Sequence, residues 1–113
     1  MHELSIALSI LEFAEEEARS RDEPITAIHL RIGPLSGVVG SALASAYELA
    51  REGTALEETE LIIEEVPVVI RCPACESEHV AESWPTLNCP GCGSPAPEVI
   101  RGRELEVVAL EIG

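Results

Sequence analysis

The sequence predicts an α+β fold in which two helices pack on a small sheet of about three strands, with a four-cysteine unit inserted into it. Three observations predict this arrangement. Two segments repeat apolar residues at helical spacing, three segments have strand patterns, and all four cysteines lie together before the last strand. With 113 residues, the chain is long enough for one modest hydrophobic core and a small second unit that needs its own staple.

Two segments have the pattern of amphipathic helices. Residues 4–20 are rich in Ala, Leu and Glu, and this helix is expected to end near residues 19–22, because Pro24 cannot continue it. A second helix is predicted over residues 41–51, before Gly53. The expected core-facing residues are Leu4, Leu8, Leu11, Ala14 and Ala18, with Ile10 and Phe13, in the first helix and Leu43, Ala46, Tyr47 and Ala50 in the second.

Three segments have the pattern of strands. Residues 27–32 alternate apolar and polar side chains, which is typical of a half-buried strand. Residues 60–70 form a longer apolar run, in which Pro67 indicates an edge position or a bulge. Residues 104–112 form the last strand. Its expected faces are Leu105 and Val107 on one side and Val108, Leu110 and Ile112 largely on the other. The cysteine segment thus separates two strands that can lie side by side.

The four cysteines form two Cys-x-x-Cys pairs, Cys72 with Cys75 and Cys89 with Cys92, separated by thirteen residues. This spacing is typical of zinc ribbons. Four thiolates complete a tetrahedral shell and leave no position for water or substrate, so we expect a structural Zn(II) ion. Iron also accepts four thiolates, but the scarcity of aromatic residues argues against a rubredoxin-like carrier. The predicted division is an inserted zinc-ribbon-like unit of residues 69–100 and a main unit of residues 1–68 plus 101–113.

Three further side chains, two histidines and one tryptophan, are candidates for metal binding or for packing. His79 lies between the cysteine pairs and is either a metal ligand or a histidine with local hydrogen bonds, and the same alternatives apply to His29 on the polar face of its strand. Trp84 is expected to pack the small unit, because one large ring compensates for a small core.

The segment Met1-His2-Glu3 is a second candidate metal site. His2 is bulky, so the initiator methionine is expected to remain, which leaves a free α-amine beside an imidazole. Amine, imidazole and backbone amide nitrogens form fused chelate rings, and nitrogen-rich square-planar sites suit Ni(II) or Cu(II). Glu3 adds a carboxylate or a supporting hydrogen bond. The competing interpretation is a frayed terminus or an ordinary helix start.

Charge and motif content exclude several classes of function. The formal net charge of −14 comes from 21 acidic and 7 basic residues, which disfavours nucleic acid and anionic membranes as partners. The N-terminus lacks the features of a secretory signal, and we expect a cytoplasmic protein. Residues 33–40 are rich in glycine but lack the order of a phosphate-binding loop. With no nucleophile motif or acid–base constellation, the sequence does not predict an enzyme.

Five segments together resemble the HypA/HybF family of hydrogenase-maturation nickel chaperones. They are residues 1–5, 32–38, 62–67, the two cysteine pairs and 102–105, and the resemblance covers essentially the whole chain. It implies nickel ligands at His2 and the nitrogens of Met1, a ligand or supporting role for Glu3, and structural zinc on the four cysteines. It also implies Ni(II) as transported cargo, delivered with a partner GTPase to the large subunit of nickel-iron hydrogenase, and in some organisms to urease through its accessory proteins.

Two positions depart from that family. Some members bring a carboxylate toward nickel from the start of the second helix, where this chain has Val38, Val39 and Gly40. Glu76 replaces the glycine that often follows the second cysteine, which is expected to alter the turn more than zinc binding. The rival interpretation is a zinc-ribbon adaptor that carries no second metal and docks a basic protein. The sequence leaves open the client enzyme, the oligomeric state and any coupling between the two metals.

Overall fold

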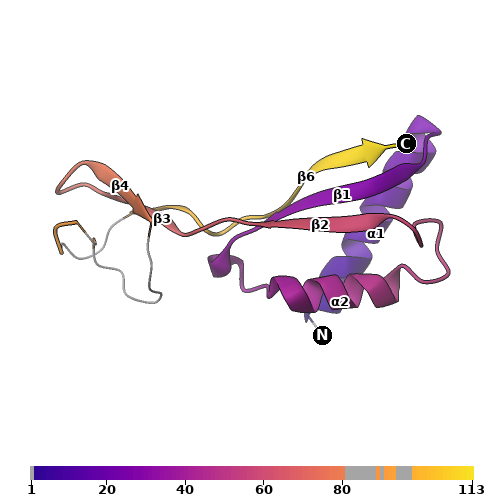
Figure 1. Ribbon diagram of the computed structural model, residues 1–113, viewed down its shortest axis with the longest axis horizontal. Helices are drawn as coiled ribbons and strands as arrows, with labels where there is room; N and C mark the ends of the chain where they lie inside the picture. The colour runs from indigo at the N-terminus through magenta and orange to yellow at the C-terminus, as the bar shows by residue number, and fades with distance from the viewer. Residues whose placement is uncertain (1, 81–88, 90, 94–97) are drawn as a thin grey trace.

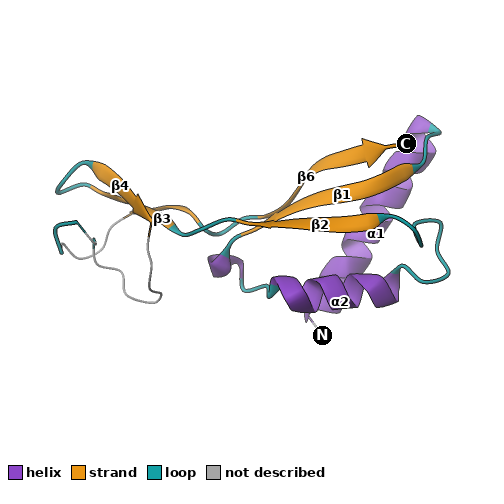
Figure 2. Cartoon of the chain, viewed as in Figure 1, coloured by secondary structure: helices purple, strands orange, loops and turns teal. Residues whose placement is uncertain are grey.

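A computed structural model describes residues 2–80, 89, 91–93 and 98–113. Within these residues, the chain forms two α-helices, one short 3₁₀ turn and strands in two separate sheets (Figures 1 and 2). The α+β class predicted from the sequence is therefore confirmed. In chain order the elements are α1 (His2–Arg21), β1 (Ile25–Ile32), η1 (Pro34–Ser36), α2 (Gly40–Ala50), β2 (Glu60–Glu65), β3 (Val69–Cys72), β4 (Ser77–Val80), β5 (Glu98–Arg101) and β6 (Leu105–Ile112).

The larger unit is built on a three-stranded sheet in the order β2-β1-β6. The central strand β1 runs parallel to β2 and antiparallel to β6. Its alternate residues Ile28, Leu30 and Ile32 are almost completely buried and pack with α1 and α2 in one core, so both helices cover the same face of the sheet. Tyr47 crosses this core from α2 and donates a hydrogen bond of 2.8 Å to the carbonyl of Thr59.

Helix α1 faces the core along part of the predicted stripe, with Ile10, Leu11, Ala14 and Ala18 as expected. Leu4, Leu8 and Phe13 are 41%, 52% and 42% exposed, so their assignment to the core was wrong. The buried residues are Ala7, Ile10, Leu11 and Ala14, with Ala18 partly buried. The buried stripe combines the small residues Ala7 and Ala14 with the larger Ile10 and Leu11, and the exposed large side chains lie at its margins. The consequence is exposed apolar surface on both flanks of α1.

The apolar run of residues 60–70 forms two strands in different sheets, not one strand. β2 ends at Glu65 and β3 begins at Val69, with Pro67 in the link, where its missing N–H breaks no strand pairing. The strands on either side of the insertion, β2 and β6, are also not neighbours, because β1 lies between them. The crossover from β1 through α2 places β2 parallel to β1 on one edge and leaves the other edge for β6.

Strand β6 contains a bulge that changes which side chains face the helices. His29 pairs with Ala109 and Leu30 pairs with Val107, so Val108 is an extra residue in the register. A one-residue shift moves later side chains to the opposite face. Val107 and Leu110 accordingly both pack against the core, whereas the sequence pattern placed them on opposite faces.

The smaller unit is a second three-stranded sheet, in the order β4-β3-β5, with β3 antiparallel to both neighbours. Figure 1 shows it extending from one end of the larger unit. At the junction, the N–H of Leu35 donates to the carbonyl of Gly102 at 2.7 Å, and the N–H of Gly33 donates to that of Glu104 at 2.8 Å. A Cβ atom on Gly33 would lie 2.1 Å from the Gly102 oxygen, so this contact requires glycine.

Candidate metal centres

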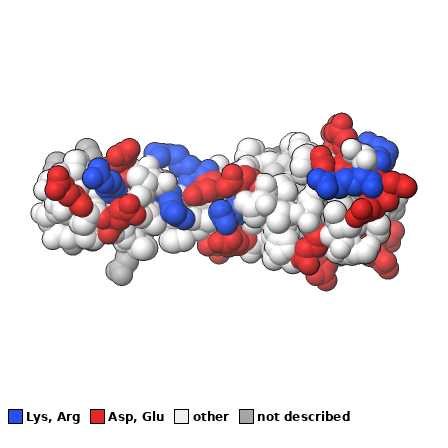
Figure 3. All heavy atoms as spheres, turned by 90° about the horizontal axis from the view of Figure 1, so that it is seen from above, with Lys and Arg blue, Asp and Glu red and all other residues white. Residues whose placement is uncertain are grey.

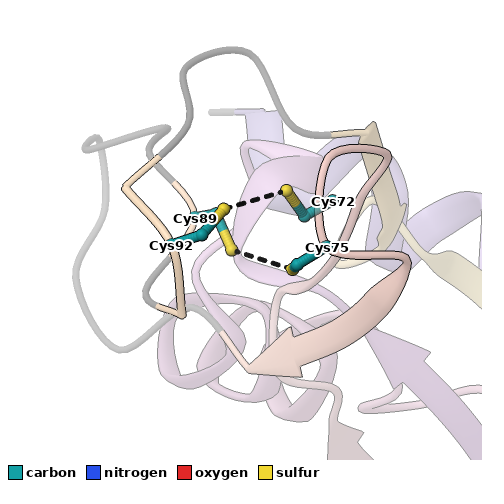
Figure 4. A group of neighbouring side chains, drawn as sticks. All are labelled: Cys72, Cys75, Cys89 and Cys92. Atoms are coloured by element: carbon teal, nitrogen blue, oxygen red, sulfur yellow. Dashed lines mark hydrogen bonds between the residues drawn. The ribbon is translucent and has the colours of Figure 1, made fainter.

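The four cysteine sulfurs lie together at the end of the smaller unit (Figure 4). All lie within 4.8 Å of one another, and the Sγ atoms are 3.5 Å apart for Cys72 and Cys92 and 3.8 Å apart for Cys75 and Cys89. A tetrahedral zinc ion with Zn–S bonds of about 2.3 Å requires sulfurs about 3.8 Å apart. The donor set and its spacing therefore fit one four-coordinate zinc ion.

The cysteines come from two separate segments of the smaller unit. Cys72 ends β3 and Cys75 lies in the turn before β4, while Cys89 and Cys92 precede β5. The residue after each pair is left-handed, with φ of 53° at Glu76 and 75° at Gly93. Glu76 therefore has the positive φ that glycine usually provides. The N–H of Gly91 also donates to the Cys89 sulfur at 3.3 Å, which offsets negative charge on that sulfur.

His79 and Ser77 lie beside Cys75. The His79 Nε2 atom is 2.9 Å from the Ser77 hydroxyl and 3.7 Å from the Cys75 sulfur, while the cysteines form the compact group of donors. The local hydrogen-bonding alternative for His79 thus matches its position. Sequence reasoning missed Ser77, although Ser77 and His79 alternate along β4 and so point to one face.

Neighbouring groups shift the pKa values of two of the thiols in opposite directions, down for Cys75 and up for Cys72. Hydrogen bonds from the Ser77 hydroxyl, and then from His79, lower the pKa of the Cys75 thiol to about 6. The backbone N–H of Cys75 lowers the pKa of Cys72, but burial and the adjacent Cys92 and Cys75 side chains outweigh it and raise that pKa to about 11. A bound divalent ion favours the thiolate at all four positions, since zinc binds thiolates and not thiols.

The N-terminal candidate lies at the other end of the molecule. His2 is the first residue of α1 and is exposed, and Glu3 in the first turn is half-buried. Met1 lies outside the described residues, as do Trp84 and Pro85. The first N–H groups of a helix have no acceptor within the helix. The amide nitrogens beside His2 are therefore not needed for the hydrogen bonds of α1.

The start of α2 has no acidic side chain of its own, but a carboxylate from another element lies beside it. Gly40 begins the helix, and the Glu65 Oε1 atom lies 3.0 Å from the position that a Cβ on Gly40 would occupy. His29 is not near the cysteines in sequence or in the fold, and its Nε2 atom is 2.6 Å from a Glu111 carboxylate oxygen. His29 thus has a local partner on the sheet.

Comparison with known proteins places the whole chain in one family. The family model described as hydrogenase/urease nickel incorporation, metallochaperone, hypA matches residues 1–112. The hydrogenase maturation factor HypA of Chloroflexus aggregans is 50% identical over 112 residues, covering 98% of each chain. That of Thermomicrobium roseum is 42% identical over 128 residues, covering 99% of this chain and 98% of its own.

Solved structures agree. The solution structure of the Ni metallochaperone HypA from Helicobacter pylori matches with a TM-score of 0.63 and 25% identity over 97% of this chain and 96% of that one. A second HypA solution structure matches with a TM-score of 0.71 and 26% identity over 99% and 96%. These matches confirm the resemblance seen in the sequence. The matched family consists of maturation factors and metallochaperones, not of enzymes. The chain is a member of the HypA family of nickel metallochaperones, which are hydrogenase maturation factors.

Proposed function

We propose that this protein binds Ni(II) at its N-terminus and delivers it for the maturation of nickel-iron hydrogenase. The proposed ligands are the Met1 α-amine, the His2 imidazole and intervening backbone amide nitrogen, with Glu3 as a carboxylate ligand or supporting group. The observation that carries this proposal is the position of His2 as the exposed first residue of α1. There the side chain is accessible and the adjacent amides are free of helix hydrogen bonds.

Electrostatics restricts the ligand set. A helix N-terminus carries partial positive charge, which disfavours a bare cation by roughly 0.3–1 kcal/mol. Neutral amine and imidazole nitrogens do not offset that charge. A deprotonated backbone amide or the Glu3 carboxylate does, and the two together neutralise the ion. Nickel at this end therefore depends on an anionic donor from the first turn of α1.

We propose that the four cysteines hold a structural Zn(II) ion. The compact group of four sulfurs supports this assignment. Two of these cysteines, Cys72 and Cys89, are buried, and the other two, Cys75 and Cys92, are exposed. Zinc bound there would satisfy its four coordination positions with thiolates and have none left for a substrate. The proposed division is a nickel-binding unit of residues 1–68 plus 101–113 and an inserted zinc-binding unit of residues 69–100.

The proposed partners follow from the family and from what this sequence lacks. Residues 33–40 have no phosphate-binding pattern, so any energy that nickel transfer needs would come from a partner, for which we propose the GTPase implied by the family resemblance. The proposed recipients are the hydrogenase large subunit and, as the alternative client, urease with its accessory proteins.

We place this activity in the cytoplasm, where a reducing environment keeps four cysteines available for zinc. None of the helices in the described part of the chain has the length and apolarity of a membrane span.

Nickel titration of the untagged protein beside its His2→Ala variant tests the proposal. The wild-type protein is expected to bind one Ni(II) per chain, and the variant to bind it at least a hundredfold more weakly, because the imidazole closes a chelate ring. Zinc content serves as the control and should stay at one ion per chain in both. Equal nickel affinity in the two proteins would leave the zinc-ribbon adaptor as the better account.

A further inference from the structure

An apolar groove runs between α1 and β6 in the larger unit. Near the N-terminus it is a hollow of about 380 Å³, lined by His2, Ile6 and Phe13 from the helix and by Leu105 and Val107 from the strand. It continues as a second hollow of about 320 Å³ farther along the same elements. Phe13 and Val107 line both hollows, so together they form one groove that follows β6.

The wall of this groove is an unpaired strand edge. β6 pairs with β1 on one side, and no other described strand pairs with its second side. Such an edge presents a row of backbone N–H and C=O groups that accept another strand. Figure 2 shows β6 at the margin of the sheet. The eight residues of β6 span about 26 Å at about 3.3 Å per residue. The bulge at Val108 adds to the exposed apolar surface there, with that side chain 42% exposed.

The charge around the groove selects among possible occupants. Of the acidic and basic side chains, Glu17, Glu106 and Arg21 line the two hollows, and α1 and β6 as a whole carry seven glutamates and two arginines. One arginine, Arg21, is already bound to Glu17 at 3.3 Å. Figure 3 shows an uncharged stretch between charged residues on this side of the molecule. A second copy of the chain would bring the same acidic elements against these, which repel one another. An extended segment with apolar and basic residues fits both the groove and its surroundings.

We propose that the free edge of β6 binds an extended, basic segment of a partner protein as a fourth strand, whose alternate apolar side chains enter the groove beside α1. In such a strand, every second residue faces the helices, and the intervening basic residues face the side on which β6 carries Glu106 and Glu111. On that side Glu111 also contacts His29 at 2.6 Å and Glu106 lies 4.0 Å from Arg31, so the added strand would share these carboxylates with β1. The end of the groove at His2 places this segment next to the proposed nickel ligand. The assignment of the partner as the nickel recipient rests on the proposed function.

A synthetic peptide tests the docking surface directly. The probe is an eight-residue peptide of alternating valine and lysine, acetylated and amidated, titrated into the zinc-loaded full-length protein. Backbone NMR shifts are expected to move at β6 and along the groove side of α1. Phe13→Asp puts a carboxylate into the groove and should weaken binding at least tenfold. The matched control, Leu49→Asp, changes a side chain that is 69% exposed on α2 and should leave binding within twofold.

Two altered peptides separate strand pairing from simple adsorption. Replacing lysine by glutamate should weaken binding at least tenfold. Methylating the amide nitrogens of alternate residues blocks one edge of the peptide, so one methylation pattern should abolish binding and the other should preserve it. Equal binding of both methylated peptides, equal loss in Phe13→Asp and Leu49→Asp, or shifts confined to the smaller unit would each overturn the proposal.

The same variants distinguish this proposal from the nickel site. Phe13 lies eleven residues from His2, about 16 Å along the helix axis, so Phe13→Asp should retain wild-type nickel affinity. In cells that depend on this protein, Phe13→Asp should lower active nickel-iron hydrogenase at least tenfold, whereas Leu49→Asp should not. Peptide binding that persists while His2→Ala leaves nickel affinity unchanged would sink the nickel proposal and keep the docking surface. Full hydrogenase activity in Phe13→Asp would refute the role of the groove in delivery.

Discussion

The candidate metal ligands at the two ends of this molecule are brought together in different ways. At the cysteine end, the four sulfurs come from two separate turns and converge within 4.8 Å, so the fold assembles the site. At the N-terminal end, the candidate ligands are consecutive residues, and His2 is exposed at the start of a helix. A site that fills all four coordination positions with protein ligands retains its ion, whereas a short open chelate can release it. In the proposed function, this contrast is that between a structural ion and a transported one.

The ends also differ in what holds them together. The main hydrophobic core contains twelve buried residues, all from residues 7–56. In the described part of the smaller unit, the buried apolar residues are few, and two of them are the cysteines Cys72 and Cys89. A unit this small cannot bury enough apolar surface to be stable alone. A metal ion is therefore expected to supply the folding energy of the smaller unit, while packing supplies that of the larger one.

The largest expected effect comes from removing one thiolate. Cys72→Ser should abolish stoichiometric zinc binding and unfold the smaller unit, because structural zinc contributes roughly 10–16 kcal/mol to the folding of such units. The core around Leu43 and Tyr47 should remain folded. Zinc analysis and amide hydrogen exchange measure the two outcomes separately. Ser77→Ala, which alters only a neighbour of the site, is the control and should retain zinc.

That experiment can also break the comparison. Loss of amide protection throughout α1 and α2 in Cys72→Ser would mean that the larger core depends on the zinc unit. A folded smaller unit without zinc would mean that its packing is sufficient. If both ends stay folded and nickel affinity is unchanged, the two metal sites are energetically independent.

Local patterns predicted most of the fold. Both helices and β1 lie where periodicity placed them, because each signal depends on neighbours three or four residues apart, or two for a strand. The spacing of the cysteines predicted two local turns for a similar reason, and the four ligands of a structural zinc predicted that these turns meet. The left-handed backbone at Glu76 was missed because residue identity favours glycine there.

The errors arose where a decision depends on distant elements. The run of residues 60–70 is continuous in hydrophobicity, and only the two sheets show that it is divided after Glu65. The bulge at Val108 has no glycine or proline to mark it, and its single extra residue changed which face Leu110 occupies. The groove beside β6 was not predictable either, because it depends on how α1 is placed against the sheet. Sequence therefore located ligands better than it located surfaces.

The junction between the two ends gives a prediction of intermediate size. Gly33→Ala would place Cβ 2.1 Å from a backbone oxygen of Gly102, and backbone must move to relieve this contact. We expect a loss of about 3 kcal/mol in the free energy of unfolding, at the upper end for overpacking. In the same loop, a Cβ on Gly37 meets nothing within 4 Å, so Gly37→Ala should cost only about 1 kcal/mol, from its left-handed backbone. Urea unfolding compares the two. Equal losses of unfolding free energy in the two variants would show that the backbone at the junction moves without cost. Zinc content is the control and should stay at one ion per chain in both variants.

The smallest expected effect lies in the two cysteine turns, which differ in one residue type. Glu76 has a φ of 53° without being glycine, and a side chain in that region costs about 1–2 kcal/mol. Glu76→Gly removes this cost but adds conformational entropy to the unfolded chain, which returns about 0.4–1 kcal/mol. The net gain of about 0.5 kcal/mol should raise zinc affinity roughly twofold.

The reciprocal change at the matching position, Gly93→Ala, introduces the same strain and should lower that affinity. Competition with a chromophoric chelator resolves both changes. Opposite signs are required if backbone geometry limits the turns, whereas a fall in both variants would mean that the Glu76 side chain itself stabilises the zinc unit.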